Sequence, residues 1–111
     1  MEIVEERRGE AVLLRVKGRL DSGTSGALEE RLLALVSGKV TRLVLNFNAL
    51  DYISSAGLRV LLMVAKKLKP TGGVLVLCNL HNHIREIFDL AGFSALFPIH
   101  DSEEAALKAL P

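Results

Sequence analysis

The apolar and polar positions at the start of the chain predict a β-hairpin. Residues 3–8 and 11–17 form two extended runs, and the Gly9-Glu10 pair between them is typical of a tight turn. In the second run, apolar residues occupy every second position, and most positions between them are polar. This alternation predicts a strand with one buried face.

Two short apolar runs farther along the chain predict central strands. RLVLNF spans residues 42–47 and VLVLC spans residues 74–78. Such runs are short, rich in strand-forming residues and without alternation, so they are typical of strands covered on both faces. We expect one more short strand at residues 94–99. The segment NALDYI, residues 48–53, is expected to be a loop.

Apolar residues at the helical period predict four helices, at residues 25–36, 55–68, 81–90 and 102–110. Gly92 follows the third helix at the position where glycine commonly ends helices. The residues expected to face the sheet are Leu28, Leu32, Leu35 and Val36 in the first helix, Leu58, Leu61, Leu62, Ala65 and Leu68 in the second, and Ile84, Ile87, Phe88 and Ala91 in the third.

The element order is β-β-α-β-α-β-α-β-α. It predicts an α/β fold in which a mixed, mostly parallel sheet follows the N-terminal hairpin and helices pack against that sheet. The chain has 111 residues, and half of them are apolar. This length and composition suit a single domain, residues 1–111, with a substantial core.

Composition narrows the classes of partner and compartment. The formal net charge is +1 and the basic residues are dispersed, which gives no electrostatic reason to expect binding to nucleic acid or to a membrane. The one cysteine, Cys78, excludes a disulfide within the chain, and its apolar setting predicts an inert buried thiol. No run is long enough to span a bilayer. We expect a cytoplasmic monomer.

The segment DYISSAGLRVLL, residues 51–62, combines two serines and a glycine with an apolar helical run. Ser54 and Ser55 stand where the second helix begins, and the positive field of a helix N-terminus favours an anion. A phosphate on Ser55 would add about −1.5 to −2 charges without melting the helix, so any switch would act on a partner's surface. The alternative is that these serines are simply N-caps.

The residues beside Ser55 suggest an interface. Arg59 and Met63 follow Ser55 at successive helical turns, and we expect Val60 and Met63 to point outward. An apolar pair next to a modifiable serine would suit a switchable contact. Asp21 is either a turn residue bonded to its own loop or part of the same surface.

Other chemistry has weaker support in the sequence. His81, His83 and His100 lack partners at ligand spacing, and the first two are not expected to share a helix face, so no metal site is predicted. DSGTSG, residues 21–26, lacks the lysine of a nucleotide-binding phosphate loop. Nothing places a histidine near Ser55 for catalysis. We therefore expect no cofactor and no enzymatic activity.

Three segments carry a resemblance to a known family. LVLNFNALDYISSAGLRVLL, VKGRLDSGTSGAL and VLCNLHNHIREIFDLAGFSALFPI occur in the order and spacing of STAS domains. They resemble in particular the bacterial anti-sigma factor antagonists. The resemblance covers nearly the whole chain, and its implied fold agrees with the element order above.

This resemblance implies a partner-switching regulator. An anti-sigma factor with serine kinase activity would bind the unphosphorylated antagonist and thereby release its sigma factor. Phosphorylation of Ser55 by this kinase would then end the binding of the antagonist. A metal-dependent serine phosphatase would reverse the mark. Asp21 matches the family's aspartate near the site. Many antagonists have aspartate where this chain has Ser54. This chain therefore has two adjacent serines, and Ser54 is the alternative acceptor.

Two other functions stay open from the sequence. A nucleotide phosphate could bind at the helix N-terminus by Ser55. Alternatively, the chain could be a scaffold in a signalling assembly that contains no sigma factor.

Overall fold

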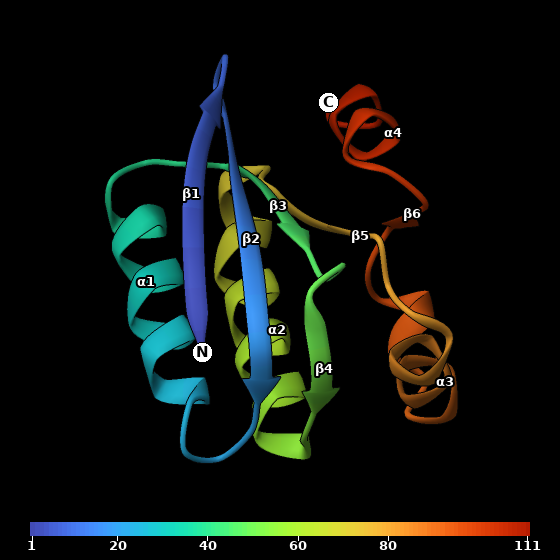
Figure 1. Ribbon diagram of the computed structural model, residues 1–111. Coiled ribbons are helices and arrows are strands. Elements are labelled where there is room, and N and C mark those ends of the chain that lie inside the picture. Colours follow the sequence, from blue (N-terminus) through green and yellow to red (C-terminus); the bar gives the residue numbers. More distant parts are fainter.

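The computed structural model describes all 111 residues. The strands and helices follow one another in the arrangement drawn in Figure 1. In chain order they are β1 (Glu2–Arg8), β2 (Ala11–Leu20), α1 (Ser25–Ser37), β3 (Arg42–Asn46), β4 (Leu50–Ile53), α2 (Ser55–Leu68), β5 (Val74–Cys78), α3 (Asn82–Leu90), β6 (Ile99–His100) and α4 (Glu103–Lys108), with 3₁₀ turns at Lys69–Thr71 and Phe93–Ala95.

The six strands form one mixed, mostly parallel sheet, as the sequence predicted. Its order is β1-β2-β3-β5-β6, and β4 pairs with β2 outside this path. Strand β1 is antiparallel to β2, whereas β3, β5 and β6 continue in parallel. Helices α1 and α2 lie together behind the first three strands, and α3 and α4 lie toward the other edge (Figure 1).

Strand β2 changes its neighbour halfway along its length. Its first half pairs with β3, and Gly18 to Leu20 pair with β4 across a register shift between Gly18 and Arg19. Gly18 has a φ of +105°, a conformation that side-chain-bearing residues rarely adopt. The bulge carries the end of β2 away from β3, so that it finishes beside β4.

Two of the predicted elements were wrong. The segment expected to be a loop at residues 48–53 contains β4, and residues 94–99 contain a 3₁₀ turn, with only Ile99 belonging to a strand. In β4 only Leu50 and Ile53 are buried, so the segment has no alternating pattern, and it owes its conformation to pairing with β2. Gly92, in a left-handed conformation as predicted, starts the turn that replaces the expected strand.

Helices cover both faces of the sheet, which explains the apolar character of β3 and β5. The main core has 23 buried residues and contains the buried faces of α1, α2 and α3. On the opposite face, α4 packs over a smaller cluster of Leu13, Val44, Val76, Cys78 and Ala106. Cys78 is buried, as predicted, and burial raises the pKa of its thiol to about 11.

The buried stripe of α2 is rotated from its predicted position. Val60 and Val64 are buried, whereas Leu62 and Ala65 are only half-buried. A pattern of apolar side chains treats Gly57 as a gap, but Gly57 is buried and marks the closest approach of α2 to the sheet. The expectation for α3 also failed at its end, where Ala91 is exposed.

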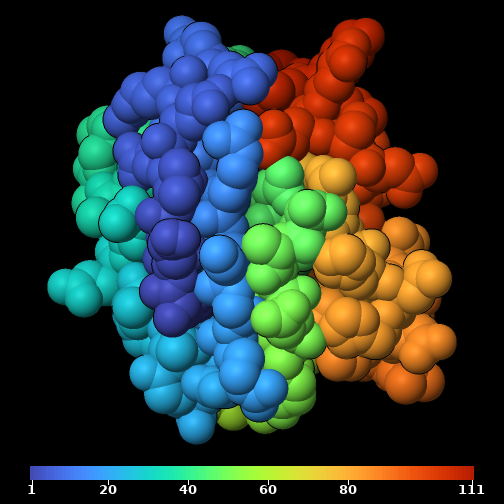
Figure 2. Space-filling view, viewed as in Figure 1, coloured from blue at the N-terminus to red at the C-terminus, as the bar shows by residue number.

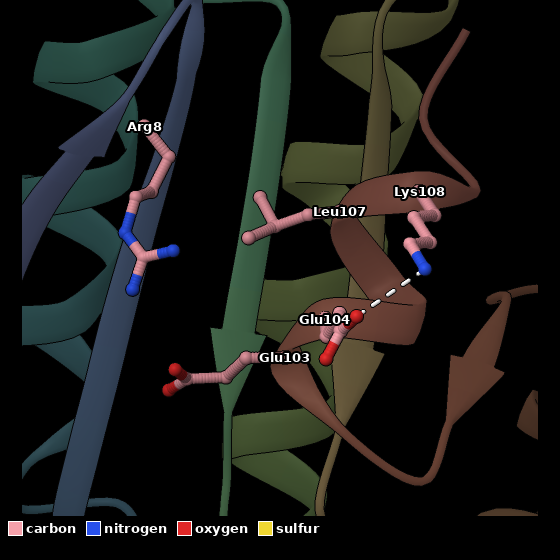
Figure 3. A pocket seen from close by; sticks show the side chains of 5 residues that line it. All are labelled: Arg8, Glu103, Glu104, Leu107 and Lys108. Atoms are coloured by element: carbon pink, nitrogen blue, oxygen red, sulfur yellow. Dashed lines mark ion pairs between the residues drawn. The ribbon is translucent and has the colours of Figure 1, made fainter.

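Helix α4 is held over the sheet by an ion pair. Arg15 Nε and Nη2 donate to the two carboxylate oxygens of Glu103 at 2.8 and 3.0 Å, and Asn46 Nδ2 donates to the same carboxylate. Figure 3 shows Glu103 pointing toward the strands, while Glu104 pairs with Lys108 on the outside of α4 at 3.2 Å. The hollow in that view is lined by charges of both signs and has no preference for one class of ligand.

Candidate functional site

The two serines at the start of α2 have different structural roles. Ser54 is the N-cap: its hydroxyl oxygen accepts from the Gly57 N–H at 3.4 Å, and its carbonyl accepts from the Leu58 N–H at 3.0 Å. Ser55 is the first residue of the helix, and its side chain is exposed. The N-cap explanation therefore accounts for Ser54 but not for Ser55.

Pairing between β2 and β4 brings the Asp21 loop to the same end of the molecule. Leu20 is paired with Ile53, and the Ser54 N–H donates to the Leu20 carbonyl at 2.9 Å. The loop after β2 and the start of α2 lie together at the lower end of Figure 1. In Figure 2 the ends of β2 and β4 are side by side on the surface. Asp21 and Ser55 thus lie at the same end of the molecule, although 33 residues separate them along the chain.

Asp21 is fixed within its loop as a charged group. Its Oδ1 accepts from the Gly23 N–H at 3.0 Å and lies 3.2 Å from the Thr24 hydroxyl. The hydrogen bond from Gly23 is the main reason that the pKa of this carboxyl is lowered. The second oxygen, Oδ2, lies 3.6 Å from Arg19 Nε. Asp21 is therefore a turn residue whose carboxylate lies next to Arg19, at the end of the molecule where α2 begins.

Gly57 lets the first turn of α2 lie against the ends of β2 and β4. A Cβ atom at this position would be 2.8 Å from Leu20 Cγ and 3.0 Å from Ile53 Cγ1. Both neighbouring side chains are buried. The glycine of the SSAGL segment is thus explained by close packing, which sets the position of Ser55 relative to Asp21.

Arg19 and Tyr52 extend the surface around this site, and the sequence analysis missed both. The Arg19 guanidinium carbon lies 4.3 Å from the centre of the Tyr52 ring, a cation–π contact. The two residues are paired across β2 and β4. Tyr52 is 37% exposed, which is unusual for an aromatic residue on this chain. The only feature of the sequence that indicated an exposed Tyr52 is its place in the NALDYI segment, which was expected to be a loop.

The expected residues on α2 are only partly at the surface. Arg59 is exposed and Met63 is half-buried, and both line one shallow hollow. Val60 is 6% exposed, so the expectation that it points outward was wrong. The cause is the rotation of the buried stripe of α2. Arg59 and Met63 stay in the candidate surface, and Val60 is removed from it.

The histidine pair has a structural role that the sequence did not indicate. The rings of His81 and His83 stack with centroids 6.1 Å apart, although they were not expected to share a face. Each Nε2 contacts a backbone carbonyl, His81 that of Asn48 and His83 that of Asp51. The pair therefore fastens the start of α3 to the segment that contains β4.

The surface near Ser55 gives no support to nucleotide binding. Five surface hollows have lining residues that include neither Ser54 nor Ser55. No group of three or more His, Cys, Asp or Glu side chains is arranged to hold a metal ion. No helix has the length and apolar character needed to cross a membrane.

Comparison with known proteins identifies the family. A sequence model of the STAS domain matches residues 2–106. BtrV of Bordetella bronchiseptica, named as a candidate anti-sigma factor antagonist, is 48% identical over 94 residues, which are 85% of this chain and 81% of BtrV. Its name agrees with the expectation of a regulatory protein rather than an enzyme.

Solved structures agree with this assignment. An anti-sigma factor antagonist from Mycobacterium paratuberculosis is 26% identical with a TM-score of 0.90, over 98% of this chain and 92% of that one. The Bacillus cell fate determinant SpoIIAA in its phosphorylated form is 24% identical with a TM-score of 0.76, over 96% and 97% of the two chains. The chain therefore belongs to the STAS domain family, and it is similar to members named anti-sigma factor antagonists.

Proposed function

We propose that this chain is an anti-sigma factor antagonist that acts by partner switching. In its unphosphorylated form it binds an anti-sigma factor with serine kinase activity, and this frees a sigma factor for transcription. Phosphorylation of Ser55 releases the antagonist, and a metal-dependent serine phosphatase restores it. The observation that carries the proposal is the exposed Ser55 hydroxyl at the start of α2, at the end of the molecule that also carries the Asp21 loop.

Ser55 is a better acceptor than Ser54 in this geometry. The Ser54 side chain is half-buried and its oxygen caps the helix, whereas the Ser55 side chain is exposed. An aspartate at the Ser54 position would cap the helix as well as serine does. Compared with an aspartate, Ser54 caps the helix equally well, but it leaves the surface next to Ser55 without that negative charge.

The phosphate would act on the partner rather than on the fold of this chain. The first turn of α2 contains no acidic residue, and its backbone N–H groups favour an anion. A phosphate adds about −1.5 to −2 charges. Asp21, at the same end of the molecule, already contributes one negative charge at neutral pH. A partner fitted to this surface would then meet concentrated negative charge, while α2 itself stays helical.

Two lines of comparison support the proposal. BtrV, which is nearly half identical to this chain, is named as a candidate antagonist of an anti-sigma factor. The Bacillus SpoIIAA structure is of a phosphorylated form. For this chain, the kinase, the phosphatase and the modified serine all belong to the proposal.

Affinity capture from a lysate of the native host tests the proposal. Wild type and Ser55→Ala should capture an ATP-binding anti-sigma factor, identified by mass spectrometry, and Ser55→Asp should lose it. Ser37→Asp is the matched control, since it adds the same charge at an exposed position where α1 ends. If Ser55→Asp captured the anti-sigma factor as well as wild type does, the switch would be contradicted. It would also be contradicted if Ser37→Asp lost the anti-sigma factor to the same extent as Ser55→Asp.

Mapping the phosphate tests the assignment of the serine. The captured kinase, supplied with ATP and Mg²⁺, should add one phosphate to wild type and to Ser54→Ala, and none to Ser55→Ala. A phosphate found on Ser54 in the wild-type protein would show that Ser54, and not Ser55, is the acceptor.

A further inference from the structure

Part of the apolar surface of α2 has no partner within the chain. Leu62 and Ala65 were expected to face the sheet, but both are only half-buried; Ala65 still packs against the main core, whereas Leu62 belongs to neither core cluster. Leu96 lies beside them and is 55% exposed, which makes it one of the most exposed large apolar residues. The chain therefore has more apolar surface along α2 than its own core covers.

This surface is a groove rather than a flat patch. Two hollows, of about 350 and 340 Å³, are both lined by Leu62 and Lys66, so they adjoin at these two side chains. We call this feature the α2 groove. Its lining residues are Arg59, Leu62, Met63, Ala65, Lys66, Lys67, Lys69, Gly73, Val74, Leu75, Leu96 and Pro98.

The charges around the α2 groove are all positive. Four cations line it, and no carboxylate does. Seven of the 14 lysine and arginine side chains of this protein form ion pairs, and none of the groove cations is among them. The unpaired cations are Arg59, Lys66, Lys67 and Lys69 in the groove, and Arg7, Lys17 and Lys39 elsewhere.

Helix stability explains only part of this arrangement. Cations in the last turn of a helix complement its dipole, which accounts for Lys66 and Lys67. The dipole does not account for Arg59, which lies in the first half of α2, or for the apolar floor. An apolar floor with a purely cationic rim is complementary to an acidic amphipathic segment.

We propose that the α2 groove binds an acidic amphipathic segment of a partner protein. Apolar side chains of that segment would cover Leu62, Ala65 and Leu96, and its carboxylates would pair with Lys66 and Lys69. The floor lies between α2 and the Leu96–Pro98 segment and is concave, which suits an inserted peptide better than the plane of a lipid bilayer. This inference rests on the proposed function in one respect: it takes the partner to be the anti-sigma factor.

Binding at the Lys66 end of the groove should depend little on the phosphorylation of Ser55. Ser55 and Lys66 are eleven residues apart on one helix, which corresponds to about 16 Å at the helical rise. The Debye length at physiological ionic strength is about 8 Å, so a phosphate on Ser55 is largely screened at Lys66 but not at Arg59, which is one helical turn from Ser55. The groove contact itself would thus be insensitive to the switch, while phosphorylation of Ser55 still releases the partner as a whole.

The direct test uses a synthetic peptide and the full-length ¹⁵N-labelled protein. The probe is a 14-residue helical peptide with leucine at positions i, i+3, i+4 and i+7 and glutamate at most others. Titration followed by NMR should give saturable shifts at Leu62, Ala65 and Leu96. The double variant Lys66→Glu/Lys69→Glu should weaken binding at least tenfold. The control Arg7→Glu/Lys39→Glu and Ser55→Asp should each change it less than twofold.

Three outcomes would overturn the proposal. They are the absence of saturable binding, an equal loss with the control variant, and shifts located away from the groove. Binding of phosphatidylglycerol vesicles through the same residues, without binding of the peptide, would assign the groove to lipid instead. Leu96→Glu provides a second variant at an exposed position where misfolding is not expected, and it should also abolish peptide binding.

The test is separable from that of the proposed function. If capture of the anti-sigma factor requires Lys66 and Lys69 but is unaffected by Ser55→Asp, the groove stands and the phosphorylation switch fails. If Ser55→Asp abolishes capture while the groove variants leave both capture and peptide binding unchanged, the switch stands and the groove proposal fails.

Discussion

Replacing Gly57 with alanine should destabilise the protein by about 2 kcal/mol, because the new methyl group has no room. The Cβ atom would lie 2.8 and 3.1 Å from Leu20 Cγ and Cδ2, and 3.0 Å from Ile53 Cγ1. Carbon atoms in ordinary contact are about 3.5–4.0 Å apart. Leu20 is fully buried and Ile53 is 2% exposed, so neither can move into solvent.

Two opposing effects set the magnitude. Overpacking a buried site costs about 1–3 kcal/mol, and three close contacts with buried atoms place this site at the upper end of the range. Alanine is favoured over glycine in a helix by about 1 kcal/mol. The difference is the expected loss of about 2 kcal/mol in the free energy of unfolding.

Urea denaturation followed by circular dichroism at the helix band measures this loss. Gly26→Ala in α1 is the matched control, because its Cβ would meet nothing within 4 Å. That variant should be unchanged or more stable by up to about 1 kcal/mol. If Gly57→Ala proved as stable as Gly26→Ala, the close approach of α2 to β2 and β4 would be refuted.

Three further predictions concern the ion pair of α4, the cysteine and the helix cap. Glu103→Gln should lower stability at pH 7 by about 1 kcal/mol, as expected for the loss of a charge-assisted pair. Arg15 lowers the pKa of Glu103 from 4.5, so this contribution is present above pH 4.5 and is lost as the pH falls through the lowered pKa; the difference in stability between the variant and wild type should therefore shrink as the pH is lowered below 4.5. Cys78, buried and with its pKa raised to about 11, should react with a thiol reagent at pH 8 only as fast as the protein unfolds, and rapid stoichiometric labelling would contradict its burial. Ser54→Ala should cost about 0.5–1 kcal/mol in urea denaturation as the loss of an N-cap, while Ser55→Ala should cost less, and the reverse order would exchange their roles.

The sequence predicted the parts of the fold that rest on local pattern. The continuous apolar runs at residues 42–47 and 74–78 indicated strands covered on both faces, and the structure places them at the centre of the sheet. Strand β4 was missed because its conformation depends on β2, a segment about 30 residues away, and its own pattern of burial does not alternate.

The candidate site was predicted only in part, for a similar reason. The capping pattern located Ser54 and Ser55 at the start of a helix, but it could not divide the two roles between them. The placement of Asp21 and Ser55 at the same end of the molecule depends on the bulge at Gly18 and on the β2–β4 pairing, which no local pattern encodes. The burial of Val60 follows from the tight packing at Gly57, since a helical wheel gives no weight to a residue without a side chain.

The role of Ser55 is tested most directly by calorimetric titration of the captured anti-sigma factor with this protein, in three states: unphosphorylated, phosphorylated to completion, and dephosphorylated again. The account predicts that phosphorylation weakens binding at least tenfold, which corresponds to about 1.4 kcal/mol, and that dephosphorylation restores it. Equal affinity in the three states would contradict the claim that a charge on Ser55 controls the partner.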